Sequence, residues 1–287
     1  MTLPLMAQDL RVLELIDRAL QEELGALGDV TTRALVPPDA VARGAILARH
    51  ACVVAGGPVA AAVFARVDPG LDVEALVADG EAAEAGAVIL GVTGRAASIL
   101  TAERTALNFM QRLTGIATLT RRFVDKVQPY GTTILDTRKT TPGLRVLEKY
   151  AVTCGGGANH RMGLYDRALI KDNHRALWRA GDASRLDLAV EACRRLHPGL
   201  AVEVEVESLA ELECALRAAP EWVLLDNMAP ELMAECVRRT AGRARLEASG
   251  GITLANVEEV ARTGVDAISL GCLTHSAPAA DLSLELD

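Results

Sequence analysis

From residue 132 onward the sequence alternates between short apolar segments and longer amphipathic ones, and this alternation limits the possible folds more than any other feature. The short segments have the length and composition of buried strands, and the segments between them have helical spacing. Repeated strand–helix units with apolar strands predict a parallel sheet covered by helices. The predicted strands are residues 132–135, 168–170, 201–204, 222–225, 245–248 and 267–270.

Polar or glycine residues follow nearly every predicted strand. Such groups at the C-terminal ends of many successive strands are typical of the mouth of an α/β barrel, whereas a doubly wound sheet concentrates its ligand groups near one switch point. Because fewer strands are clear than the eight of a complete barrel, we expect an open, incomplete barrel. The strand-end groups are Asp136, Thr137, Arg138, Lys139, Lys171, Asp172, Glu205, Asp226, Ser249, Gly250, Gly251 and Gly271.

The first hundred residues have a different pattern and predict a separate, smaller α+β domain. Residues 12–24 have helical spacing, and residues 45–51 and 85–94 are predicted as strand and turn pieces. Residues 103–127 predict a long helix, interrupted near Gly115. Ser and Thr are favoured N-caps and Pro is favoured at the first helical position, so three further helices are expected to begin at Thr141-Pro142, Ser208 and Thr253.

Composition argues against several classes of partner. The net charge of −8 opposes binding to polyanions and the aromatic content is only 3%, so we expect no nucleic-acid partner. No apolar run reaches the roughly 18 residues of a membrane span, and we expect no membrane association. The 6 cysteines are scattered without a Cys-x-x-Cys pair, which argues against a zinc site or a disulfide framework and favours a cytoplasmic location.

The candidate site combines a group of cations with two acids. A cation cluster in an acidic protein predicts a highly anionic ligand, because Arg binds carboxylates and phosphates in a bidentate manner and Lys provides a point contact. Glu205 and Asp226, on adjacent predicted strands, suit a Mg²⁺ ion shared with phosphates, and they also suit a developing positive charge. The cations are Arg104, Arg138, Lys139, His160, Arg161 and Lys171.

A glycine-rich turn near the end of the chain suits a phosphate group. Ser249, Gly250 and Gly251 offer backbone N–H groups just before a predicted helix, and late strand ends of α/β barrels often bind phosphate. Each feature alone has a simpler reading: most such turns are only turns, and the alternation around Glu205 means nothing on a solvated edge strand. Their coincidence at successive strand ends favours the interpretation as a binding site.

Ten segments of the sequence, in order along essentially the whole chain, resemble the quinolinate phosphoribosyltransferase family. The longest matches are ILDTRKTTPGLR at 134–145 and CGGGANHRMGLYD at 154–166. The others are GDVTT (28–32), ERTALN (103–108), EKYAV (148–152), LIKDNH (169–174), EVEV (203–206), LLDN (224–227), EASGGI (247–252) and LTHS (273–276).

The resemblance implies an N-terminal α/β sandwich domain over residues 1–115, to which residues 276–287 return, and an open α/β barrel over residues 116–275. It also implies a homodimer in which the small domain of one subunit caps the barrel of its neighbour; whether dimers form hexamers stays open. Its catalytic residues would be Lys139, Lys171, Glu205 and Asp226. The dicarboxylate and pyrophosphate pocket would contain Thr137, Arg138, Lys139, His160, Arg161, Lys171 and, from the other subunit, Arg104; the 5′-phosphate would contact Ser249, Gly250, Gly251, Ser269, Leu270 and Gly271.

The implied reaction joins quinolinate to phosphoribosyl pyrophosphate and gives nicotinate mononucleotide, pyrophosphate and CO₂, a step of de novo NAD biosynthesis. Pyrophosphate leaves the ribose with help from Mg²⁺ and the cations, and an oxocarbenium-like centre develops near Glu205 and Asp226. The pyridine nitrogen attacks this centre. The 2-carboxylate then leaves as CO₂, because the quaternary ring nitrogen stabilises the carbanion. No organic cofactor is expected.

Three alternatives differ in substrate or reaction class. A paralogue found with molybdate-uptake genes shares the implied fold and acts on another ribosyl substrate. Lys171 at its strand end also fits a Schiff-base aldolase. A lipoyl- or biotinyl-like carrier in residues 1–100 is excluded, because these residues contain no Lys to modify.

Overall fold

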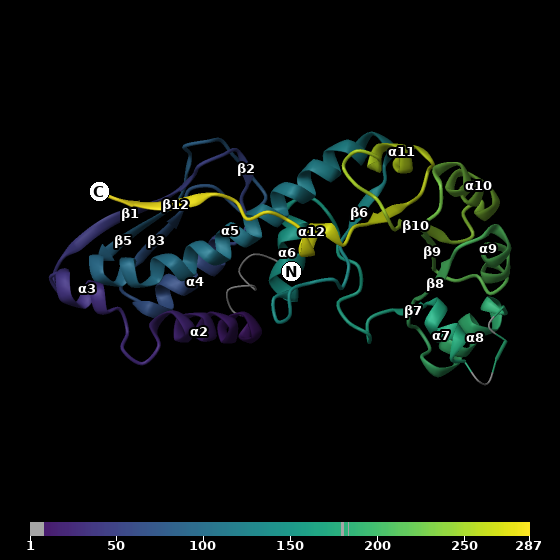
Figure 1. Cartoon of the computed structure of the whole chain (residues 1–287), viewed down its shortest axis with the longest axis horizontal. Coiled ribbons are helices and arrows are strands. Elements are labelled where there is room, and N and C mark those ends of the chain that lie inside the picture. The colour runs from purple at the N-terminus through teal and green to yellow at the C-terminus, as the bar shows by residue number, and fades with distance from the viewer. Residues whose placement is uncertain (1–8, 179–180, 183) are drawn as a thin grey trace. The chain divides into compact units, whose positions relative to one another are not determined.

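Six strands of the computed structural model form one parallel sheet in the order β6-β11-β10-β9-β8-β7 (Figure 1). The structure describes residues 9–178, 181–182 and 184–287. The first strand, β6, pairs with the last, β11, and within the described residues no pairing joins β6 to β7. The sheet is therefore a barrel that is open between its first two strands, which confirms the predicted fold class. The strands are β6 (Thr133–Leu135), β7 (Ala168–Ile170), β8 (Val202–Val206), β9 (Trp222–Asp226), β10 (Arg245–Ser249) and β11 (Ala267–Ser269).

The strand register separates an aliphatic face of this sheet from a polar one. Paired positions of parallel strands point to the same side. One set of paired positions, Ile170, Val204 and Val223, is buried and aliphatic, and it suits the side covered by helices. On the opposite face Glu205 is in register with Leu224, and Leu224 with Glu247. The polar residues of the strands therefore share the inner side of the barrel.

Short helices connect the barrel strands. Ser208 accepts a hydrogen bond from the Glu211 amide at 3.3 Å, which confirms the predicted start of the following helix. Thr253 lies four residues before the α-helix that it was expected to begin, and Asn256 is the N-cap residue there. These helices are α7 (Asp172–Ala176), α8 (Leu186–Leu196), α9 (Leu209–Leu216), α10 (Pro230–Thr240) and α11 (Val257–Arg262), and a short helix, α12 (Cys272–His275), follows the last barrel strand.

The rest of the chain contains a four-stranded antiparallel sheet in the order β12-β1-β5-β3 and a two-stranded β2-β4 pair. The last strand of the chain, β12, pairs with β1, so the C-terminus returns to the N-terminal sheet (Figure 1). The strands are β1 (Val41–Ala48), β2 (Cys52–Val53), β3 (Asp72–Ala75), β4 (Ala82–Ala83), β5 (Val88–Arg95) and β12 (Leu282–Leu286). The helices are α2 (Leu10–Leu24), α3 (Val30–Leu35), α4 (Gly57–Val67), α5 (Ala96–Val127), η1 (Gln128–Tyr130) and α6 (Arg145–Cys154).

The chain folds into two compact units. The first contains residues up to Arg121, Thr140–Gly156 and Leu273–Asp287; the second contains Arg122–Lys139 and Gly157–Cys272. Residues 140–156 thus lie outside the barrel unit, unlike in the boundaries implied by the resemblance. Glu148, which is fully buried, accepts hydrogen bonds from Arg112 at 2.7 Å and from the amide of Thr141 at 3.0 Å.

The prediction that a helix begins at Thr141-Pro142 is wrong. The helix α6 begins at Arg145, and Thr141 instead uses its amide and hydroxyl groups to bind the Glu148 side chain.

In the described part of the chain, no helix has both the length and the apolar character needed to cross a bilayer.

The helix α5 runs through Gly115 without the interruption that the sequence suggested. A Cβ atom at this position would lie 2.0 Å from the carbonyl oxygen of Pro278. Glycine is therefore required for close approach of the C-terminal segment and does not break the helix, since one helical glycine costs only about 1 kcal/mol.

Replacing Gly115 with alanine is expected to destabilise the protein although alanine favours helices. Overpacking typically costs about 1–3 kcal/mol, which outweighs the roughly 1 kcal/mol gained in helix propensity. Urea unfolding should show a lower free energy of unfolding for Gly115→Ala. Gly91→Ala is the control, because a Cβ there meets nothing within 4 Å; equal stability of the two variants would contradict the packing account.

Candidate active site

The segment after α6 returns to the barrel at the edge of β6. Ala158 forms a parallel bridge with Leu135, donates to the carbonyl of Ile134 at 2.8 Å, and accepts from the amide of Asp136 at 3.2 Å. Asp136 is fully buried. Its carboxylate accepts from the His160 amide at 2.9 Å and from the Asn159 side chain at 2.6 Å. Asp136, the residue directly after β6, thus fixes the loop that carries His160 and Arg161.

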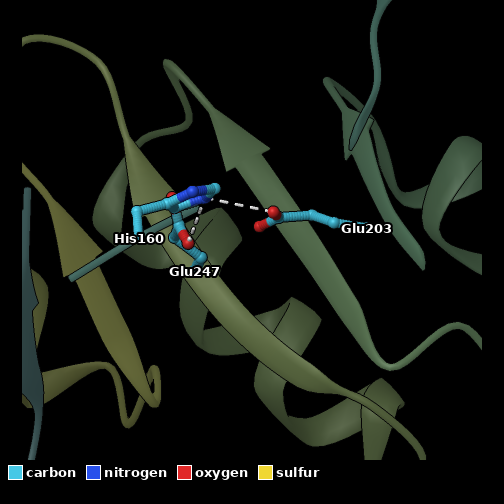
Figure 2. A group of neighbouring side chains, drawn as sticks. All are labelled: His160, Glu203 and Glu247. Carbon is cyan, nitrogen blue, oxygen red and sulfur yellow. Dashed lines mark ion pairs between the residues drawn. The ribbon is translucent and has the colours of Figure 1, made fainter. Parts of the chain in front are cut away.

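The ring of His160 lies between two buried carboxylates from strands that are not neighbours (Figure 2). Its Nε2 atom is 3.1 Å from Glu203 on β8 and 3.3 Å from Glu247 on β10. Its Nδ1 atom accepts the Arg161 amide at 2.7 Å. Nε2 is therefore the nitrogen that carries a proton toward the carboxylates.

The charges of this cluster perturb one another. Burial lowers the pKa of His160, but the hydrogen bonds to Glu203 and Glu247 outweigh it and raise the pKa to about 9. Burial raises the pKa of Glu247. Burial also acts to raise the pKa of Glu203, yet His160 and Arg167 outweigh it and lower that pKa. The amide contact at Nδ1 favours a neutral ring and the carboxylates favour a charged one; both states keep the proton on Nε2.

His160, Glu203 and Glu247 are also the three groups that could hold a metal ion, in the part of the chain that the structure describes. Nε2 would have to lose its proton before it could bind a cation, and the two carboxylates raise the pKa of the His160 ring. We therefore interpret the cluster as a proton-linked one.

The same unit contains cations in the loop before β7 and directly after β7. Arg161 is 8% exposed, and burial followed by the charge of Arg138 lowers its pKa. Lys171, directly after β7, forms an ion pair with Glu205 on β8. The neighbouring positive charges of Arg138 and Arg161 favour a ligand that carries more than one negative charge.

The turn at Ser249, Gly250 and Gly251 requires glycine at its centre. Gly250 has φ +93°, and a Cβ there would lie 2.1 Å from the side-chain oxygen of Asn227. The Asn227 amide donates to the carbonyl of Ser249 at 2.9 Å, and its side chain donates to Asp226 at 3.0 Å. The sequence suggested that this turn leads directly into a helix. This expectation is wrong, because α11 begins only at Val257.

The structure brings most of the predicted site residues to one unit and leaves one in the other. Arg104 lies on α5 in the first unit, 54% exposed and 4.0 Å from Glu103. The remaining predicted residues all belong to the second unit: Thr137, Arg138, Lys139, His160, Arg161, Lys171, Glu205, Asp226, Ser249, Gly250, Gly251, Ser269, Leu270 and Gly271.

Sequence reasoning missed two residues, Glu203 and Glu247. The alternation that placed Glu203 on the same face as Glu205 was visible, and Glu247 precedes Ser249 by the same two-residue step. Both signals identify the face of the strand. Neither identifies His160 as the partner, because the histidine comes from a distant loop.

An open α/β barrel with cations, two carboxylates and a glycine turn at its strand ends defines a class of enzymes that bind polyanionic substrates. Residues 116–285 match the family model for the quinolinate phosphoribosyl transferase C-terminal domain, and residues 29–114 match that for its N-terminal domain. The chain belongs to the quinolinate phosphoribosyltransferase family.

Several proteins are similar in sequence to this chain over nearly its whole length. The nicotinate-nucleotide pyrophosphorylase (carboxylating) of Mycobacterium leprae is 45% identical over 276 residues, which cover 94% of this chain and 95% of the relative. Quinolinate phosphoribosyltransferase (decarboxylating) 1b of Nicotiana tabacum is 42% identical over 288 residues, covering 95% and 81%. The solved structure of the nicotinate-nucleotide pyrophosphorylase from Francisella tularensis is 39% identical, with a TM-score of 0.90 and 96% of each chain covered.

Proposed function

We propose that the mouth of the barrel is the active site at which this chain transfers the phosphoribosyl group to quinolinate. Membership of the family makes the chain a phosphoribosyltransferase of NAD biosynthesis. The observation that supports the site is the pairing of opposite charges on the inner face, where Lys171, directly after β7, forms an ion pair with Glu205 on β8. The charge of Glu203 likewise acts on the buried Arg161. Such a site can bind an anionic substrate and still present a carboxylate to a developing cation.

In the proposed mechanism each group acts on one part of the reaction. Arg138 and Arg161 hold the carboxylates of quinolinate, and Lys139 assists the departing pyrophosphate. Glu205 and Asp226 stabilise the positive charge that develops on the ribose as pyrophosphate leaves. The turn at Ser249, Gly250 and Gly251, with Ser269, Leu270 and Gly271, holds the 5′-phosphate.

Magnesium fits the same two acids. Glu205 and Asp226 are carboxylates at the ends of neighbouring strands, and Mg²⁺ prefers one or two carboxylates together with substrate phosphates. When bound, the ion would neutralise charge on the pyrophosphate. Glu205 already pairs with Lys171, so we expect the metal to bind together with phosphoribosyl pyrophosphate.

The direct test supplies quinolinate labelled in its 2-carboxylate, phosphoribosyl pyrophosphate and Mg²⁺, and measures labelled CO₂ and nicotinate mononucleotide. Release of CO₂ that depends on phosphoribosyl pyrophosphate is the expected result. A folded protein that releases none would refute the proposed reaction and would reopen the molybdate-associated paralogue. A Schiff-base aldolase is disfavoured, because Lys171 is paired as a cation with Glu205 and a Schiff base requires a neutral amine.

We further propose a homodimer with shared active sites. Arg104 is exposed and lies in the first unit, so it is available to serve the barrel of a second subunit. Mixing Arg104→Ala with Lys171→Ala subunits should restore about a quarter of the wild-type activity, since half of randomly paired dimers are hybrids with one intact site.

The control mixture contains Lys139→Ala and Lys171→Ala subunits, which we place in the same barrel and which should not complement each other. If subunit exchange is verified and the Arg104→Ala mixture stays inactive, Arg104 does not act across the dimer.

Assembly of dimers into hexamers would be tested by measuring the mass in solution. A cytoplasmic location also remains a proposal, which rests on the scattered cysteines.

A further inference from the structure

Two fully buried glutamates lie deeper in the barrel than the residues assigned to substrate. Glu203 and Glu247 are 0% exposed, on strands separated by β9, and both reach the same nitrogen of His160 (Figure 2). A buried carboxylate is costly unless its contacts compensate for the loss of water. An aliphatic pair would fill the same space at lower cost, so packing alone does not explain these two acids.

The contacts of Glu203 form a closed circuit that contains Arg161. The same oxygen of Glu203 contacts His160 Nε2 at 3.1 Å and Arg167 Nη1 at 3.2 Å. The carbonyl of Arg167 accepts from the guanidinium of Arg161 at 3.1 Å, and the amide of Arg161 donates to His160 Nδ1 at 2.7 Å. The orientation of the His160 ring is therefore tied to both the main chain and the side chain of Arg161.

The opposite side of the loop is held independently. Asp136 binds the His160 amide and the Asn159 side chain, and Ala158 bridges to β6. These bonds fix the main chain up to residue 160. The direction of Arg161 then depends on its contacts with the His160 ring and with the carbonyl of Arg167.

We infer that Glu203 and Glu247 are positioning residues for the transfer reaction: they fix the His160 ring, which in turn holds Arg161 in the orientation that binds the carboxylates of quinolinate. This inference rests on the proposed function. The glutamates do not contact substrate themselves. Their effect should fall on quinolinate and not on phosphoribosyl pyrophosphate, whose 5′-phosphate lies with the glycine turn in the proposed site.

The test compares Glu203→Gln and Glu247→Gln with the wild type, each alone and combined with His160→Gln. Misplacement of a binding group by about 1 Å can reduce rates by about 100-fold. We expect each glutamine variant to raise the KM for quinolinate by roughly 10-fold or more with little change in the KM for phosphoribosyl pyrophosphate. In the His160→Gln background Glu247→Gln should add almost nothing, because Glu247 acts through the ring. Glu203→Gln should keep only the part of its effect that passes through Arg167.

Asp187→Asn is the matched control: Asp187 is a buried carboxylate on α8 of the same unit, but it pairs with Arg185, the N-cap residue of that helix. It should lower the melting temperature without changing the KM for quinolinate. Equal shifts of both KM values, or full additivity with His160→Gln, would overturn the inference. If a glutamine variant does not fold, the wild type still decides: NMR should detect a solvent-protected Nε2–H proton of His160, and its absence would be contrary to the inference.

The two proposals fail separately. Absence of CO₂ release by the wild type would refute the reaction, whereas normal wild-type turnover with unaffected glutamine variants would refute only the positioning role.

Discussion

Quinolinate should be turned over with one CO₂ released per nucleotide formed, whereas nicotinate should be nearly inert under the same conditions. Arg161 is 8% exposed, and burial, followed by the neighbouring charge of Arg138, lowers its pKa. Two adjacent carboxylates can satisfy this pair of cations together. Nicotinate has one carboxylate and would leave a desolvated cation poorly matched, which costs on the order of a few kcal/mol. Sites built to hold a polar group reject analogues that lack it by about 10⁴-fold or more.

The measurement is kcat/KM for the two acids at fixed phosphoribosyl pyrophosphate and Mg²⁺, with CO₂ and nucleotide quantified in the same reaction. Arg161→Lys is a useful companion variant, since it keeps the charge but loses the bidentate geometry. The ratio of kcat/KM for quinolinate to that for nicotinate should be smaller in this variant than in the wild type. Comparable kcat/KM for the two acids in the wild type would overturn the assignment. Nucleotide formation without stoichiometric CO₂ would do the same.

Replacing Lys139 or Lys171 with methionine should reduce kcat/KM by a factor of about 30 to 1,000, which corresponds to roughly 2–4 kcal/mol for the loss of one preorganised charged donor. Methionine keeps the length of the apolar stem and removes the ammonium group. Lys139 is exposed in the loop after β6, so its loss should leave the stability unchanged. Lys171 pairs with Glu205, so its loss should also leave an acid without its cation.

Lys126→Met is the control for this pair, because Lys126 is an exposed lysine in the last turn of α5. Circular dichroism and thermal unfolding should show that all three variants fold. If the Lys139 and Lys171 variants both keep the kcat/KM of the Lys126 variant, the cation cluster is not the active site.

The sequence determined the class of fold and the face of each strand, because both follow from local patterns. The six predicted barrel strands match β6 to β11 to within about two residues at each end. The alternation at Glu203 and Glu205 correctly placed these residues on one face, since successive side chains in a strand point to opposite sides. Polar residues after the strands likewise marked the ends at which Lys171 and Asp226 lie.

Only the tertiary structure decided which groups meet, because those contacts join residues far apart in the chain. The sequence predicted that Gly115 interrupts its helix. The structure shows instead that glycine is needed there because the carbonyl of Pro278 lies close to it. Thr141 has the sequence of an N-cap, yet the buried carboxylate of Glu148 takes both its hydrogen bonds. His160 offers two ring nitrogens to any partner, and the barrel alone brings Glu203 and Glu247 to one of them. A local pattern determines the side of a strand on which a side chain lies, but the packing of distant segments determines which groups it contacts.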